Sequence, residues 1–162
     1  MGTMTHNLRR KAGAVLMLLI LSGCGGNPET PEDQLRQLIQ TAEPAVESRD
    51  LGDVMALIDP DYRDADSRNF YQLRGMIAGY FLRHPSIFVI SRIDRIELAG
   101  DTEATVVLTA GLAGSAQEAA GPLSGWRGNL LRFDLSFQRD EAAQWRLRSA
   151  AWRPATREDF TH

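Results

Sequence analysis

The chain has 162 residues and a net charge of −3, from 18 basic and 21 acidic side chains. A chain of this length builds one compact domain around a single core. Lys11 is its only lysine and Cys24 its only cysteine. This composition excludes a P-loop or Schiff-base lysine after residue 11, an internal disulfide and a Cys/His zinc site.

The first 24 residues have the three parts of a secretory signal. Arg9-Arg10-Lys11 is a cationic start, residues 12–21 are apolar or small, and Leu21-Ser22-Gly23-Cys24 is a small-residue exit. Ten helical residues span about 15 Å, half the hydrocarbon core of a bilayer, so this segment is too short to cross it. The exit resembles the lipobox of bacterial lipoproteins, which implies that Cys24 carries lipid and becomes the first mature residue. An ordinary cleaved signal with a chance cysteine is the alternative.

Removal of residues 1–23 would leave 15 basic residues against 21 acidic ones, a net charge of −6. A domain this acidic, without a basic cluster, is a poor match for the phosphate backbone of nucleic acid. We therefore expect no nucleic-acid partner, and a membrane contact through lipid on Cys24. By resemblance to enteric lipoproteins, Gly25 after the cysteine favours the outer membrane. The expected location is the periplasmic or exterior face of a bacterial membrane.

Two helices are predicted at the start of the mature domain. Thr30 has the hydroxyl of an N-cap, and the spacing of apolar residues predicts a helix over 31–48 that bends at Pro44, on its water side. Asp50 is expected to cap a shorter second helix, which Asp59-Pro60 ends.

A third helix is predicted between Ser67, which is expected to cap its start, and Pro85, which ends it. Its outer side carries Gly75 and Gly79, and glycine inside a helix lowers stability relative to alanine. These glycines are either a product of neutral drift on a solvated face or positions where another element approaches the helix closely. The predicted apolar face joins Phe70, Leu73, Ile77, Tyr80, Phe81 and His84.

Beyond Pro85 the apolar pattern changes to a period of two, which predicts strands. The first is expected over 87–98, with a phase slip near 92–95 that a β-bulge explains. Residues 155–162 read as a frayed tail. Three further strands are expected near 104–110, from 126 to 137 and from 145 to 152.

Helices followed by antiparallel strands predict an α+β domain, with about three N-terminal helices packed on one face of a curved sheet of at least four strands. This order, with the loop Asp61-Tyr62-Arg63-Asp64 and the closing segment 144–152, resembles the cone-shaped nuclear transport factor 2-like (SnoaL-like) superfamily over residues 31–153. A ferredoxin-like or cystatin-like domain is the alternative. The other expected segments are a signal at 1–23, an anchor and tether at 24–30 and a tail at 154–162. The predicted core contains Leu38, Ala42, Ile77, Phe81, Leu108, Phe133 and Trp145.

The resemblance implies a pocket between the helices and the concave face of the sheet, where some members use a carboxylate, histidine or tyrosine. Here His84 is either a general base or an ordinary histidine at the edge of the core. Tyr62 and Asp64 are either an acid–base pair or a packed phenol and a turn cap. Tyr62, His84 and Trp126 each join an apolar body to a polar tip, so we predict that they bind ligand at the pocket mouth.

Three functions remain open from the sequence. We favour a lipid-anchored binding or accessory module of the cell envelope, whose apolar pocket takes a small ligand or part of an envelope protein. The second is a small-molecule isomerase- or dehydratase-type enzyme, and the third is an assembly component of an envelope complex, which would expose an apolar patch. No catalytic residue, metal or cofactor is predicted, and a homodimer is left open.

Overall fold

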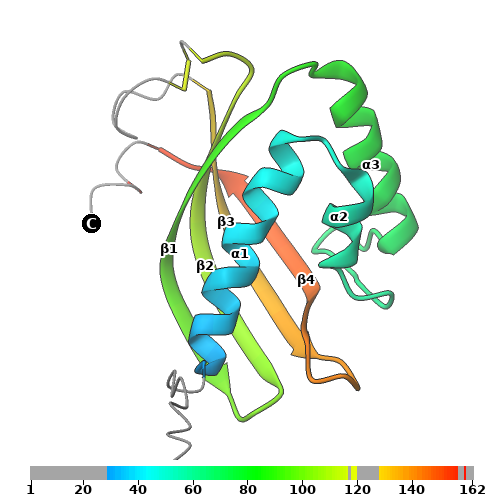
Figure 1. Cartoon of the computed structure of the whole chain (residues 1–162), viewed down its shortest axis with the longest axis vertical. Coiled ribbons are helices and arrows are strands. Elements are labelled where there is room, and N and C mark those ends of the chain that lie inside the picture. The colour runs from blue at the N-terminus through cyan, green and yellow to red at the C-terminus, as the bar shows by residue number, and fades with distance from the viewer. Residues whose placement is uncertain (1–28, 117, 120–127, 157–158, 160–162) are drawn as a thin grey trace, which may run out of the picture.

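The computed structural model describes residues 29–116, 118–119, 128–156 and 159 (Figure 1). Its first half is helical. α1 lies across one face of the sheet, while α2 and α3 lie on the side of the last strand (Figure 1). The helices are α1 (Pro31–Glu47), α2 (Leu51–Ala56) and α3 (Phe70–Arg83).

The second half is one antiparallel sheet in which each strand pairs with the next along the chain. The predicted α+β class is confirmed, with helices first and a curved four-stranded sheet after them. The strands are β1 (Phe88–Ala99), β2 (Glu103–Ala113), β3 (Asn129–Arg139) and β4 (Trp145–Pro154).

The caps of the first two helices are as predicted. The Thr30 hydroxyl accepts a hydrogen bond from the Asp33 amide, and the Asp33 carboxylate accepts one from the Thr30 amide, which forms a capping box. Asp50 caps α2 by accepting from the amide of Asp53. Pro44 is exposed inside α1, as its position opposite the apolar stripe indicated.

The predicted cap of the third helix is wrong. Asn69, not Ser67, caps α3, in a capping box with Gln72. Ser67 has a φ of 64° and belongs to the preceding turn. That turn is closed by Asp64, whose carboxylate accepts the amides of Asp66 and Arg68, so the chain becomes helical only beyond it.

The sheet shows the predicted irregularity. The pairing of β1 with β2 shifts between Ile93 and Arg95, where the sequence predicted a bulge. Gly100 has a φ of 69° in the turn that follows β1, a conformation that glycine adopts without strain. β2 continues to Ala113, beyond its predicted end, and Trp126 lies outside the described residues.

The inner face of the sheet carries the core. Of the predicted core, Phe81, Leu108 and Trp145 are buried, whereas Ala42 is half-buried. Leu38, Ile77 and Phe133 are partly buried and pack against the core. β2 is also buried on its outer face, where Val107 and Thr109 are 2% and 0% exposed.

Candidate functional site

Three buried side-chain atoms among the described residues have no hydrogen-bond partner. They are the Tyr62 hydroxyl, Nε of Arg139 and Nε1 of Trp145. All three groups can donate a hydrogen bond. A buried polar group without a partner costs about 1–3 kcal/mol, so such groups are rare in native proteins. The interior of the domain therefore offers donors that nothing in the described chain accepts.

Two of these donors lie together where α1 meets the β3–β4 hairpin. Arg139 and Trp145 are cross-strand partners, and the Arg139 guanidinium lies 4.8 Å from the centroid of the Trp145 ring. One guanidinium nitrogen of Arg139 donates to the Gln34 side-chain oxygen at 2.8 Å. We call Gln34, Arg139 and Trp145 the hairpin cluster. Its cation and unpaired N–H groups could hold an oxygen acceptor of a ligand.

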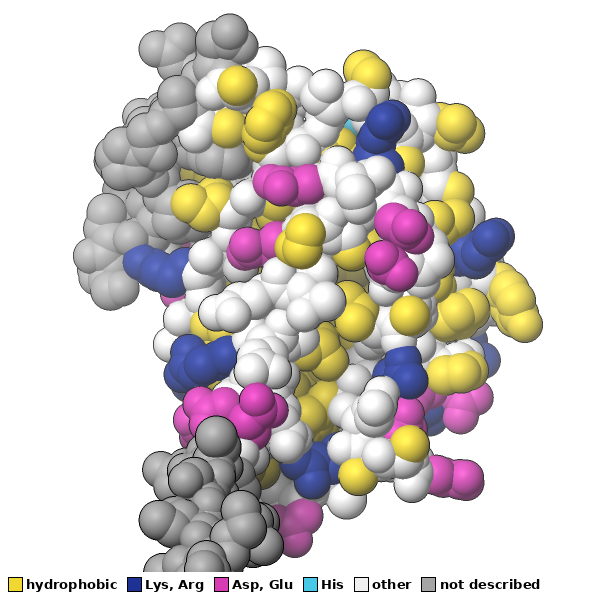
Figure 2. Space-filling view, viewed as in Figure 1, with side chains coloured by type: hydrophobic (Ala, Val, Ile, Leu, Met, Phe, Trp, Pro, Cys, Tyr) yellow, Lys and Arg dark blue, Asp and Glu magenta, His cyan; other side chains and the backbone are white. Residues whose placement is uncertain are grey.

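A hollow is visible between α1 and β4, with hydrophobic side chains on its floor (Figure 2). The inner face of the strands below it is apolar, because Leu135 and Phe137 precede Arg139 at alternate positions of β3. Trp145 and Leu147 continue this face on β4. Small-molecule sites usually combine an apolar surface with a few polar or charged groups, as the apolar side chains of this hollow and Arg139 of the hairpin cluster do.

Tyr62 is only 1% exposed and lies in the chain between α2 and α3. This chain runs beside β4, because the amide of Asp59 donates to the Leu147 carbonyl and that of Ala65 donates to the Ala150 carbonyl. Burial raises the pKa of the Tyr62 phenol far above its ordinary value, and the negative charge of Asp64 adds to this shift. The phenol is therefore a protonated donor at neutral pH.

Asp64 acts as a turn cap. Its side chain is 0% exposed and accepts the amides of Asp66 and Arg68 at 2.9 and 2.8 Å. It also accepts from Nε of Arg68 at 2.6 Å, and this bond raises the pKa of Arg68. The Arg68 guanidinium in turn lies 5.0 Å from the Trp152 ring. Of the two roles considered for this carboxylate, these contacts match the capping role.

His84 lies at the other end of α3. It is the C-cap residue, half-buried, and its ring stacks on that of Tyr80 with centroids 4.1 Å apart. His84 follows the C-terminal end of α3, whereas the loop that carries Tyr62 precedes the N-terminal end of this helix of fourteen residues. Trp126 lies outside the described residues. A shared pocket mouth for Tyr62, His84 and Trp126 stays a prediction.

Arg139 is not among the site residues predicted from the sequence. Strand parity could have found it, because Arg139 has the same parity on β3 as Leu135 and Phe137. An arginine that continues an inward apolar face is unusual unless it has a partner. Trp145 was expected in the core, and the structure places it there, with its indole N–H unpaired.

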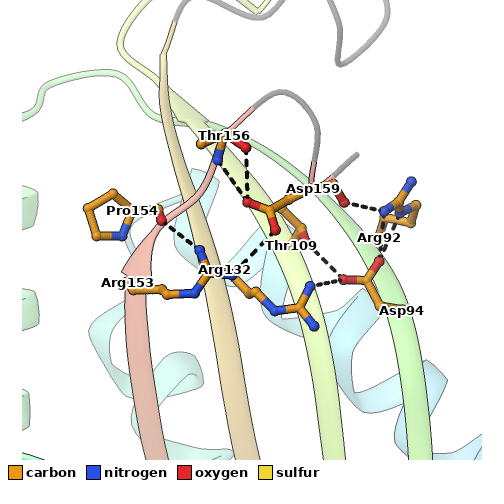
Figure 3. A network of polar contacts seen from close by, with 8 residues as sticks. All are labelled: Arg92, Asp94, Thr109, Arg132, Arg153, Pro154, Thr156 and Asp159. Carbon is orange, nitrogen blue, oxygen red and sulfur yellow. Dashed lines mark hydrogen bonds and ion pairs between the residues drawn. The ribbon is translucent and has the colours of Figure 1, made fainter. Parts of the chain in front are cut away.

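The outer face of the sheet carries a second polar cluster (Figure 3). The Asp94 carboxylate, at the bulge in β1, accepts from Nε of Arg92 at 3.0 Å, the Thr109 hydroxyl at 2.9 Å and Nη1 of Arg132 at 3.1 Å. A cavity of about 410 Å³ is lined by these two arginines, Asp94, Ile93 and Asp159. Asp94 thus holds β1, β2 and β3 together from the side away from the helices.

The C-terminal segment binds to this cluster. Asp159 pairs with Arg153 at 3.3 Å, its carbonyl accepts from Arg92, and its carboxylate accepts the Thr156 amide at 2.8 Å (Figure 3). The bond from the Thr156 amide is the main reason why the pKa of Asp159 is lowered. Where the structure describes the predicted frayed tail, at Thr156 and Asp159, it is held against the sheet.

Two further features are absent from the described part of the chain. It contains no group of three or more His, Cys, Asp or Glu residues placed to hold a metal ion. None of the helices described is both long enough and apolar enough to cross a bilayer.

Comparison with known proteins identifies the architecture. No protein-family model and no curated protein matches the chain. Among solved structures, an NTF-2 like protein of unknown function from Shewanella oneidensis is 18% identical, with a TM-score of 0.57 over 76% of this chain and 98% of that one. A candidate dehydratase of the NTF2-like family from Streptomyces avermitilis is 17% identical, with a TM-score of 0.57 over 78% and 99%.

A third similar structure is Bd1075 of Bdellovibrio bacteriovorus, which is 10% identical with a TM-score of 0.58. The match covers 75% of this chain but spans only 40% of Bd1075. At these identities the shared property is the arrangement of helices and strands. The chain therefore has the nuclear transport factor 2-like fold that its order of elements indicated.

Proposed function

We propose that this protein is a lipid-anchored binding module of the bacterial cell envelope, which holds a small apolar molecule bearing a hydrogen-bond acceptor. The observation that carries the proposal is the set of unpaired donors in an apolar interior, on Tyr62, Arg139 and Trp145. Burial of these donors without a partner costs free energy, and a ligand oxygen that accepts a hydrogen bond from one of them would offset that cost. A carbonyl or carboxylate on an apolar body has the required chemistry.

The hairpin cluster favours a carboxylate over a neutral carbonyl. The side chain of Arg139 is a cation, and it donates to the neutral amide oxygen of Gln34. An arginine binds a carboxylate more strongly than an amide, because the hydrogen bonds are charge-assisted. The ligand class that fits best is an amphipathic carboxylic acid, with its apolar part against the inner face of the sheet.

The Tyr62 hydroxyl offers a test with an unusual sign. Tyr62→Phe is expected to raise the free energy of unfolding of the ligand-free protein by about 1 kcal/mol, because it removes an unpaired buried hydroxyl and leaves the ring in place. Urea titration of the two proteins measures the change. Tyr71→Phe is the matched control, since Tyr71 is 79% exposed and its replacement is expected to change stability little.

Ligand binding is tested in the parent chain and in Arg139→Gln with a panel of apolar carboxylic acids and ketones of graded chain length. Melting temperature should rise with at least one acid, and Arg139→Gln should reduce that rise more than it reduces the rise with a ketone. A loss of stability in Tyr62→Phe would show that the hydroxyl has a partner. If no compound raises the melting temperature, the binding function is wrong.

The anchor is tested separately by Cys24→Ser. We expect the parent chain in the membrane fraction of a bacterial host and the variant in the soluble fraction, because stable anchoring needs the acyl chains that only a cysteine can receive at this position. Outer-membrane fractions should contain the parent chain, since Gly25 follows the cysteine. Equal recovery of both proteins in membranes would contradict the lipobox interpretation.

An enzyme is the second candidate, because one similar structure is described as a candidate dehydratase. Acid–base catalysis would need a titratable pair within hydrogen-bond reach in the hollow. Asp64 is engaged by Arg68 and two amides, which leaves His84 beside Tyr80 as the pair to examine. Substrate turnover that His84→Ala abolishes would favour the enzyme over the binding module.

A further inference from the structure

The outward face of α3 is apolar, and three of the four residues that form it are exposed, while Ala78 is half-buried. Tyr71, Gly75, Ala78 and Leu82 follow one another at helical spacing, opposite the buried Leu73. Tyr71 is 79% and Leu82 87% exposed, which are high values for large apolar side chains. A Cβ atom added at Gly75 would meet nothing within 4 Å. α3 therefore has apolar residues on both sides, a composition typical of a helix that is covered on both sides.

The charge of α3 differs from that of the other helices. α3 contains Arg74 and Arg83 and no acidic residue. At 100° per residue, these arginines lie on either side of the line from Tyr71 to Leu82. α1 carries four acidic residues and α2 carries Asp53, and the chain from residue 24 onward has a net charge of −6. Among the helices described, α3 alone has no acidic side chain that an anionic surface would repel.

We propose that this face of α3 docks on the anionic surface of the bilayer that holds the lipid anchor. The proposal rests on the lipid attachment at Cys24 proposed above. Tyrosine and leucine flanked by arginines suit the boundary between headgroups and acyl chains, where the apolar side chains insert and the guanidinium groups meet phosphates. The small residues Gly75 and Ala78 let the helix axis lie close to that boundary.

The same features disfavour a second copy as the occupant. Two α3 helices packed face to face would bring four arginines together, with no acid on either helix. Weak docking on the bilayer is sufficient, because a tether of residues 24–30 can span at most about 25 Å and would keep the domain near the surface. Loss of two arginine contacts to anionic lipid would shift the docking equilibrium about 30-fold.

The experiment uses the full lipidated chain reconstituted into vesicles. Lipid on Cys24 leaves no free thiol, so Leu82→Cys provides one site for an apolar fluorophore, and Leu98→Cys, at a 40% exposed position of β1, provides the control. Quenching by acrylamide is compared in vesicles of phosphatidylcholine and of phosphatidylethanolamine with phosphatidylglycerol. The label at 82 should be shielded from acrylamide only in the vesicles that contain phosphatidylglycerol, and the label at 98 should be shielded in neither kind of vesicle. The double variant Arg74→Glu, Arg83→Glu should lose the shielding at 82.

Three outcomes overturn the proposal. Unreduced quenching at 82 in both kinds of vesicle means that α3 does not dock on anionic lipid. Shielding of the label at 82 in both kinds of vesicle means that a second copy or another protein covers the face. Shielding in detergent that increases with protein concentration has the same meaning. A chain that does not float with either kind of vesicle shows that the anchor itself is absent, which removes the basis of the proposal and is recognised before any quenching is measured.

Discussion

Asp64→Ala is expected to lower the free energy of unfolding by about 3 kcal/mol, because a fully buried carboxylate is the shared acceptor of two amides and a guanidinium. Without it, the amides of Asp66 and Arg68 lose their acceptor. The loss stays below the largest values for broken buried ion pairs, since the Arg68 side chain is 32% exposed and water can solvate it. Urea titration gives the change directly.

Asp66→Ala is the matched control for this prediction. Asp66 also pairs with Arg68 at 2.6 Å, but its side chain is 70% exposed. An exposed pair contributes at most about 1 kcal/mol, so the control should stay close to the parent protein. Equal losses in the two variants would mean that attraction between charges, rather than burial and backbone capping, accounts for the stability of the turn.

The turn also determines where α3 lies. The amide of Ala65 donates to the carbonyl of Ala150 on β4, and the Arg68 guanidinium lies over Trp152 of the same strand. Asp64 therefore joins the entry of α3 to β4 as well as closing a local turn. Loss of Asp64 should loosen α3 before the sheet, and faster amide exchange in 70–83 than in β2 would report it.

Local signals in the sequence predicted most element boundaries, because caps and turns depend on residues within four positions of each other. Thr30 with Pro31 and the aspartate at 50 have the expected roles. The third cap failed for a local reason too. Ser67 and Asn69 are both good caps, and the choice between them depends on the turn that Asp64 closes, which the pattern of apolar residues does not show.

The candidate site was harder to predict than the fold. Periodicity indicates which face of an element a residue occupies, and it placed Trp145 inward correctly. It does not indicate which polar groups on that face remain unpaired, because this depends on contacts between distant segments. The bond from Arg139 to Gln34 joins residues 105 positions apart.

The alternation of residues along a strand predicts which face a side chain occupies but not how deeply it is buried. Two phenylalanines on the same face of β3 test this difference in depth. Phe137 is 3% exposed, whereas Phe133, on the same face, is partly buried with its ring 6.4 Å from that of Trp152. Phe137→Ala should therefore cost about 3–5 kcal/mol, the range for a phenylalanine enclosed on all sides. Phe133→Ala should cost roughly half as much, because part of its surface already contacts water and its site can relax.

The comparison of Phe137→Ala with Phe133→Ala uses identical chemistry at two positions of one strand, so effects on the unfolded state largely cancel. Denaturant titrations with equal slopes would make the difference in midpoint a direct measure of depth. Phe133 lies four residues nearer to the start of β3 than Phe137 does. Equal losses would show that Phe133 is enclosed as well, and that the inner face of the sheet is closed at this end rather than open to a ligand.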